Sequence, residues 1–175
     1  MLGSFSVTVK LNFGEEGSFW LTKYGSNKPW WRRDFWMELQ DLYGLTFPIW
    51  CVGGDFNVIR RIYEKLGASR LTSNMRCFDE FIRESGLFDP PLRNVAFTWS
   101  NMQDVPICKK LDRFLFSCEW DHFFSQTLQE ALPRWTSDHN PICLETNPLK
   151  WGPSPFRFEN MWLLHPEFKE NFSAW

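Results

Sequence analysis

Apolar and polar residues alternate along residues 4–13, and the apolar side chains fall at every second position: Phe5, Val7, Val9, Leu11 and Phe13. This alternation is typical of a strand with one buried face, so we expect these apolar side chains to pack inward. The sequence Gly-Glu-Glu-Gly at 14–17 predicts a turn, and residues 18–24 return as a second strand. The pattern therefore predicts a β-hairpin over the first 24 residues.

Helical spacing replaces this alternation in two later segments. Apolar residues at intervals of three and four predict a helix that ends near Gly44, with a stripe made of Trp31, Phe35, Leu39 and Leu42. The same spacing predicts a helix over 73–85 that Gly86 closes, with a stripe made of Met75, Phe78, Phe81 and Ile82.

A short apolar run over 47–52 separates the two helices, and a glycine pair follows it. Such a run is typical of a strand that is covered on both faces. Residues 60–72 predict a polar loop, and further short apolar stretches occur at 95–99, 111–116, 126–132 and 141–145. Strands and helices thus interleave, which indicates an α/β fold with mixed sheets.

The composition narrows the class of protein. The 175 residues suffice for one domain with its own core, and 43% hydrophobic with 23% charged residues excludes wholesale disorder. No apolar run reaches membrane-spanning length and no secretory signal is visible, so we expect an intracellular protein of the nucleus or cytoplasm without a membrane partner. A net charge of −2 counts against nucleic-acid binding by electrostatics alone. The 18% aromatic content favours core packing over base stacking.

Polar and ionisable residues follow the predicted strand at 49–52. Asp55 and Asn57 come after a glycine pair, which lets a ligand approach the backbone closely. Ligand sites of α/β sheets gather at the carboxyl ends of strands, and an acid with an amide suits metal or phosphate chemistry. The alternative is an Asx-turn, and these two residues taken alone favour it.

Two other stretches have the same character. Asp112 and Arg113 stand at the head of an apolar strand, where a surface ion pair is the alternative. Asp138 and His139 precede the last predicted strand, where they can bring a carboxylate and an imidazole into one site. Imidazole is the side chain best suited to proton transfer near neutral pH. A serine-led turn is the alternative for this pair.

Four groups of residues lie near predicted strand ends, in the order Tyr24, Asp55 with Asn57, Asp112 with Arg113, and Asp138 with His139. This order resembles the endonuclease/exonuclease/phosphatase superfamily, which has the deoxyribonuclease-I-like fold. Four segments are similar to one branch, the apurinic-type endonuclease domain of plant non-long-terminal-repeat retrotransposons: 20–27, 34–39, 97–101 and 155–162. The resemblance makes residues 1–147 a partial endonuclease domain and residues 148–175 a connector that leads toward a reverse transcriptase. It implies a partial four-layer sandwich, with two mixed β-sheets flanked by helices and the first strands missing.

The resemblance also implies a reaction, the hydrolysis of DNA phosphodiesters by water with Mg²⁺ or Mn²⁺. By this likeness Asp55 would hold and deprotonate the attacking water, and Asn57 would bond a phosphate oxygen. His139 would contact the phosphate while Asp112 orients its imidazole, and Asp138 would belong to the metal site.

Four further residues take weaker roles from the same resemblance. Tyr24 would lie against the phosphate from the opposite side, with a core position as the alternative. Trp99, Asn101 and Arg113 are candidates for DNA contact, with an ordinary solvated surface as the alternative. The implied partners are DNA and a reverse transcriptase domain in the same polyprotein.

The sequence departs from the family pattern at its start. A strand-borne asparagine and the principal metal-binding glutamate of the family have no counterpart, since Glu15 and Glu16 lie in a predicted turn. We therefore expect a degenerate member with little or no nuclease activity. A non-catalytic remnant with weak nucleic-acid or protein binding is the alternative, and a phosphatase or lipid phosphodiesterase of the same fold is a third.

Overall fold

The computed structural model describes residues 3–12, 18–25, 32–67 and 70–146. In chain order its elements are β1 (Ser6–Asn12), β2 (Ser18–Gly25), α1 (Arg32–Thr46), β3 (Trp50–Asp55), the 3₁₀ turn η3 (Ile62–Glu64), α2 (Ser73–Glu84), β4 (Trp99–Ser100), β5 (Cys108–Lys109), β6 (Asp112–Phe116), α3 (Cys118–Phe123), β7 (Leu128–Ala131) and β8 (Ile142–Glu145). Within these residues no helix combines the length and apolarity that crossing a membrane requires. The expected connector at 148–175 lies outside the described residues.

The central sheet has four strands in the order β1-β2-β3-β6. β1 and β2 are antiparallel, β2 and β3 are parallel, and β3 and β6 are antiparallel, so the sheet is mixed. In the described part of the chain, the remaining strands form two antiparallel pairs, β4-β5 and β7-β8. The predicted α/β class with a mixed sheet is therefore confirmed, and two short strand pairs stand where a second sheet was expected.

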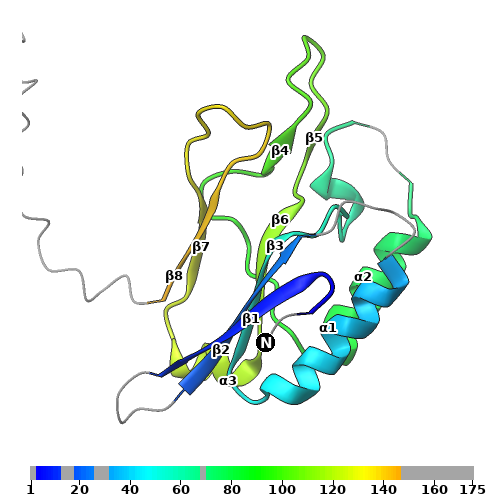
Figure 1. Cartoon of the computed structure of the whole chain (residues 1–175). Helices are drawn as coiled ribbons and strands as arrows, with labels where there is room; N and C mark the ends of the chain where they lie inside the picture. The colour runs from blue at the N-terminus through cyan, green and yellow to red at the C-terminus, as the bar shows by residue number, and fades with distance from the viewer. Residues whose placement is uncertain (1–2, 13–17, 26–31, 68–69, 147–175) are drawn as a thin grey trace, which may run out of the picture.

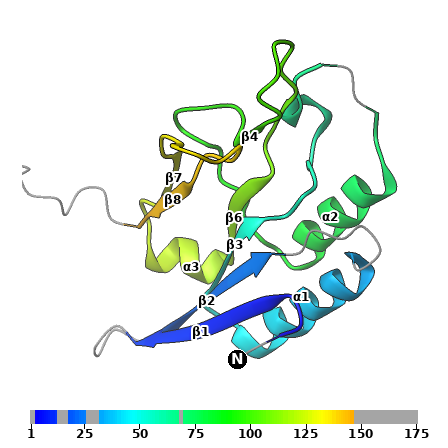
Figure 2. The same cartoon turned by 45° about the horizontal axis from the view of Figure 1, so that its top comes forward.

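Helices α1 and α2 lie side by side against one face of the sheet, whereas α3, β7 and β8 lie on the other side (Figures 1 and 2). The stripe predicted for the first helix is confirmed at the three positions described: Phe35, Leu39 and Leu42 are buried. The stripe of the second helix is also confirmed, because all four of its predicted members are buried. Thr72 caps that helix by accepting a hydrogen bond from the backbone N–H of Met75.

Aromatic rings fill the core between the helices and the sheet. The Trp36 ring stacks on Phe78 at a centroid distance of 5.1 Å, and Phe78 stacks on Phe56 at the same distance. Phe56 follows β3 directly, so this stack joins α1 and α2 to the end of the strand that carries Asp55. The expectation that aromatic residues serve mainly the core holds for this cluster.

The prediction for the first strand is correct in position and wrong in its buried face. β1 buries Ser6 and Thr8, whereas Val7, Val9 and Leu11 are exposed. The hydroxyls are buried because they have partners: Thr8 and Thr22 share a hydrogen bond of 2.9 Å between their Oγ1 atoms. The indole N–H of Trp50 also donates to Thr22 Oγ1, at 2.8 Å. Satisfied hydroxyls can occupy a core face without the penalty of an unpaired polar group.

Candidate active site

Asp55 and Asp112 stand directly opposite each other on neighbouring strands. Asp55 is the last residue of β3 and Asp112 the first of β6, and the antiparallel register pairs the two. A close contact between the same strands supports this register. The Phe114 ring lies on Gly53, where the Cβ of any larger residue would overlap it. A glycine at this position therefore lets β6 pack against β3 with the two carboxylates side by side.

His139 completes the group. Its Nδ1 lies 2.8 Å from Asp112 Oδ2, and its Nε2 lies 3.9 Å from Asp55 Oδ2. The imidazole is thus oriented by Asp112 and presents its other nitrogen toward Asp55. This arrangement brings together three of the residues that the sequence predicted, from β3, β6 and the loop before β8.

Thr98 holds these segments in place, and the sequence did not single it out. Its buried Oγ1 accepts hydrogen bonds from the backbone N–H groups of Leu111 and Asp112, each at 3.0 Å. Its carbonyl oxygen accepts from the backbone N–H of Asn140 at 2.7 Å. Thr98 therefore connects the start of β6 with the loop that carries His139. A clue to this role is its place within the segment 97–101, which shares the family resemblance.

Burial changes the proton affinity of Asp55. Desolvation raises the pKa of Asp55, and the nearby charge of Asp112 raises it further. The hydrogen bond from the backbone N–H of Asn57 to Asp55 Oδ1, 2.8 Å long, and the charge of His139 act in the opposite direction, yet the pKa stays above its usual value. The Asx-turn that the sequence suggested is therefore present. It coexists with the carboxylate cluster, and Asn57 accommodates the turn with a φ of 53°.

Asp138 lies next to this group but has a different partner. Its Oδ2 accepts a hydrogen bond of 2.7 Å from the indole N–H of Trp99, which lowers the pKa of Asp138. Trp99 also has the ammonium of Lys109 over its ring, 4.9 Å from the centroid. The structure thus places Asp138 on the exposed side of the site. Among the described residues, the three groups close enough to share one ion are those of Asp55, Asp112 and His139.

The other predicted residues occupy distinct places. Asn101 closes the hairpin loop between β4 and β5, because its Oδ1 accepts from the backbone N–H of Ile107 at 2.8 Å. Tyr24 pairs with Gly54 in the sheet register, one residue before the Asp55 pair, and its side chain lies outside the described residues. Arg113, which we expected near DNA, points to the opposite face of β6 from Asp112, because successive side chains alternate along a strand.

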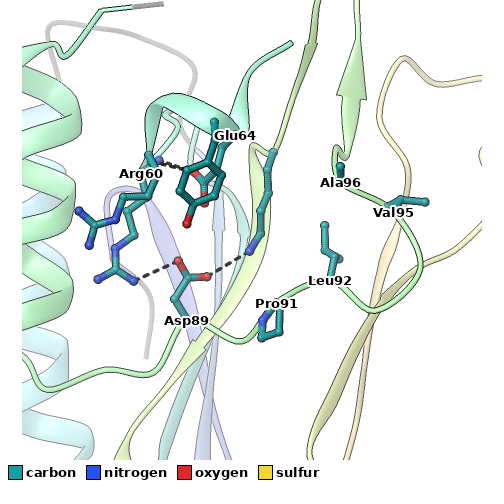
Figure 3. Close-up of a pocket in the computed structure, with 10 residues that line it drawn as sticks. Arg60, Glu64, Asp89, Pro91, Leu92, Val95 and Ala96 are labelled. Carbon is teal, nitrogen blue, oxygen red and sulfur yellow. Dashed lines mark hydrogen bonds and ion pairs between the residues drawn. The ribbon is translucent and has the colours of Figure 1, made fainter.

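Arg113 is completely buried in a network of ion pairs. Its guanidinium contacts Glu64 Oε2 at 2.9 Å and Asp89 Oδ2 at 2.8 Å. Asp89 also pairs with Arg60 and Lys110, both at 3.3 Å, beside a pocket of about 300 Å³ (Figure 3). Burial raises the pKa of Asp89, but these three cations outweigh it and leave that pKa lowered. Arg113 therefore serves the packing of the fold, and it has no exposed surface with which to contact DNA.

The three-residue group fits a divalent cation. One ligand atom each from Asp55, Asp112 and His139 lies within 4.8 Å of the others. Mg²⁺ is commonly held by one or two carboxylates with several waters, and Mn²⁺ also accepts carboxylate ligands. Because Mg²⁺ prefers oxygen ligands, a magnesium ion here would rest chiefly on the two carboxylates.

Comparisons with known proteins identify the fold. No family model and no curated protein match the sequence. A solved structure, the endonuclease domain of TRAS1, a telomere-specific non-LTR retrotransposon, matches with a TM-score of 0.63 and 13% sequence identity. The chain has the fold of that endonuclease domain. The match covers 80% of this chain and 62% of the TRAS1 domain, so the chain spans less than two thirds of that domain's length.

Proposed function

We propose that this protein hydrolyses phosphodiester bonds in DNA with the help of a divalent cation, as the endonuclease of a non-long-terminal-repeat retrotransposon. The observation that carries the proposal is the geometry of Asp55, Asp112 and His139, where the end of β3, the start of β6 and the loop before β8 meet. A carboxylate pair with an oriented imidazole can both bind a cation and move a proton near a phosphate. The TRAS1 fold supports DNA as the substrate.

Each residue takes a role that its surroundings favour. Asp112 keeps the His139 ring fixed through Nδ1, so Nε2 can donate a hydrogen bond to a phosphate oxygen when the ring is protonated. Asp55 has a raised pKa, which makes its carboxylate a better acceptor for the proton of an attacking water. Asn57 follows within two residues and would donate its side-chain amide to a phosphate oxygen.

The metal would be bound by the carboxylates of Asp55 and Asp112, with Asp138 close by on the exposed side. When bound, it would supply positive charge that offsets the charge developing on the phosphoryl oxygens. Two carboxylates offer little negative charge to balance a divalent ion, so the affinity of the site for the cation should be low. We therefore propose slow turnover rather than efficient cleavage.

Several finer assignments belong to the same proposal and rest on the sequence resemblance. They are the partial four-layer sandwich without its first strands, the plant branch of the family, Tyr24 as a phosphate contact, and residues 148–175 as a connector toward a reverse transcriptase in cis. A second candidate function is DNA binding without hydrolysis. The site offers few metal ligands, because one oxygen of Asp112 already hydrogen-bonds His139, and this favours binding without hydrolysis.

A plasmid-nicking assay separates the two candidates. The wild-type protein should convert supercoiled plasmid slowly to the open-circular form with Mg²⁺ or Mn²⁺, and EDTA should stop the reaction. Asp55→Asn and His139→Gln should each lower the rate by about 10²-fold or more, since proton-transfer groups contribute on this scale. Asp41→Asn, which changes an exposed acid on α1, serves as the matched control. Equal nicking by wild type and Asp55→Asn would refute hydrolysis at this site and leave DNA binding as the function.

A further inference from the structure

A fully exposed indole lies beside the candidate active site. Trp135 is 94% exposed, the highest value for a large apolar side chain among the described residues. It belongs to the loop 132–141 between β7 and β8, which also carries His139. Tryptophan is a residue that folded proteins usually bury in large part, because its ring offers a large apolar surface.

Trp135 lines a groove of about 800 Å³. The groove is formed by two loops, since Met102 comes from the β4–β5 hairpin and the other lining residues come from the β7–β8 loop: Arg134, Thr136, Ser137 and Asp138. Met102 is itself 63% exposed, so both large apolar side chains are open to solvent. Figure 1 shows the two loops projecting from the same end of the molecule. The groove thus combines an aromatic face, a flexible thioether and a guanidinium.

Hydrogen bonds close the loop that presents the indole. The backbone N–H of Leu132 donates to the carbonyl oxygen of Pro141 at 2.7 Å, and the side chain of Asn140 donates to the carbonyl oxygen of Leu132 at 3.2 Å. Arg134 Nη1 donates to the Asp138 carbonyl oxygen at 3.4 Å. The loop therefore has a defined path, and Trp135 lies at its exposed tip.

The groove also borders the reaction centre. Asp138 lines the groove, and its neighbour His139 belongs to the carboxylate–imidazole group. Because the groove and the reaction centre share the segment 137–139, a base held in the groove would belong to a nucleotide close to the phosphate at His139.

We propose that this groove binds one unstacked nucleobase of the DNA strand, with its ring stacked on Trp135, beside the scissile phosphate. The inference rests on the proposed function for the identity of the substrate. An exposed aromatic ring with an adjacent arginine is the combination that proteins use to hold single-stranded nucleic acid, and stacking tolerates any base sequence. The protein thereby prefers DNA that is locally unpaired at the cleavage position.

The test measures binding separately from cleavage. Fluorescence anisotropy in EDTA follows a labelled single-stranded oligonucleotide, and 2-aminopurine in a one-base bulge reports stacking through quenching. Trp135→Ala should weaken binding by about 10-fold and abolish the quenching, whereas Trp135→Phe should retain most of both. Tyr63→Ala removes another highly exposed ring, at η3 outside the groove, and should bind as wild type. The slope of affinity against salt should be unchanged in Trp135→Ala, because no charge is removed.

The outcomes are distinguishable from those of the nicking assay. Wild-type affinity and quenching in Trp135→Ala, or equal losses in Trp135→Ala and Tyr63→Ala, would overturn the groove proposal even if nicking is observed. A Trp135-dependent loss of binding in a protein that does not nick would support the groove and refute hydrolysis. A wild-type protein that binds neither oligonucleotide overturns the groove proposal.

Discussion

Replacing Arg113 with methionine should cost this protein a large part of its stability. The guanidinium has no exposed surface and bonds both oxygens of Glu64, at 3.0 and 2.9 Å, and one oxygen of Asp89, at 2.8 Å. It also donates to the Lys110 carbonyl oxygen at 2.9 Å. Methionine keeps an unbranched apolar stem in the same place and removes all four contacts at once.

The magnitude follows from what the substitution leaves behind. Removing one partner of a buried ion pair costs about 3–5 kcal/mol, because the remaining charge stays buried without compensation. Asp89 keeps Arg60 and Lys110, and Glu64 Oε2 keeps the backbone N–H of Arg60 at 2.6 Å. These remaining partners place the expected loss near the lower end, at about 3 kcal/mol. A typical domain has about 5–15 kcal/mol in total, so the variant should fold but with little reserve.

Urea unfolding followed by tryptophan fluorescence measures this loss. With a slope of about 2 kcal/mol per molar urea, the midpoint of Arg113→Met should fall by about 1.5 M. Arg93→Met is the matched control, because Arg93 is exposed and its ion pair with Glu130 is 3.4 Å long. Such surface pairs contribute about 0–1 kcal/mol. A midpoint for Arg113→Met that equals that of Arg93→Met would refute the reasoning, as would additive losses in Arg113→Met/Glu64→Gln, since contacting partners should couple.

Three further outcomes follow from the core and the site. Phe78→Ala should lower the free energy of unfolding by about 3–5 kcal/mol because it empties the Trp36–Phe78–Phe56 stack, whereas Phe47→Ala at an exposed position should change the urea midpoint little. Because the pKa of Asp89 is lowered in the folded protein, its charge stabilises the fold above the unfolded pKa of about 3.9. This stabilisation is lost as the pH falls through the folded pKa. The urea midpoint of wild type should therefore drop more steeply in acid than that of Asp89→Asn. Thr98→Val should leave the backbone N–H groups of Leu111 and Asp112 unpaired and slow nicking while DNA binding in a gel-shift assay persists; unchanged nicking would contradict its positioning role.

The helices could be predicted because each has apolar residues on one side only, and that side must face the core. The first strand shows where such reasoning stops. Alternation divides Val7, Val9 and Leu11 from Ser6 and Thr8, but the pattern alone does not say which face meets the core. The choice depends on partners distant in sequence, namely Thr22 for Thr8 and Glu38 for Ser6. A hydroxyl with a bonding partner can take the place that an apolar residue was expected to fill.

The same limits apply to the site. Asp55, Asp112 and His139 could be predicted as a group only through the family resemblance, because each pair of residues taken alone was equally compatible with a turn or a surface ion pair. The different surroundings of Asp138 and His139 could not be predicted, since they depend on the indole of Trp99. Arg113 could have been excluded from the sequence, because a residue next to Asp112 in a strand must face the other side of the sheet.

The register that places Asp55 opposite Asp112 sets two like charges against each other across the sheet. Burial adds to this penalty at Asp55, whose pKa is raised, whereas Asp112 is also held by its hydrogen bond to His139. Asp55→Asn should therefore make the protein more stable while it weakens the cation site. Under the proposed function, selection for stability and selection for cleavage would act in opposite directions on Asp55, and drift should remove this carboxylate first in copies that no longer depend on cleavage.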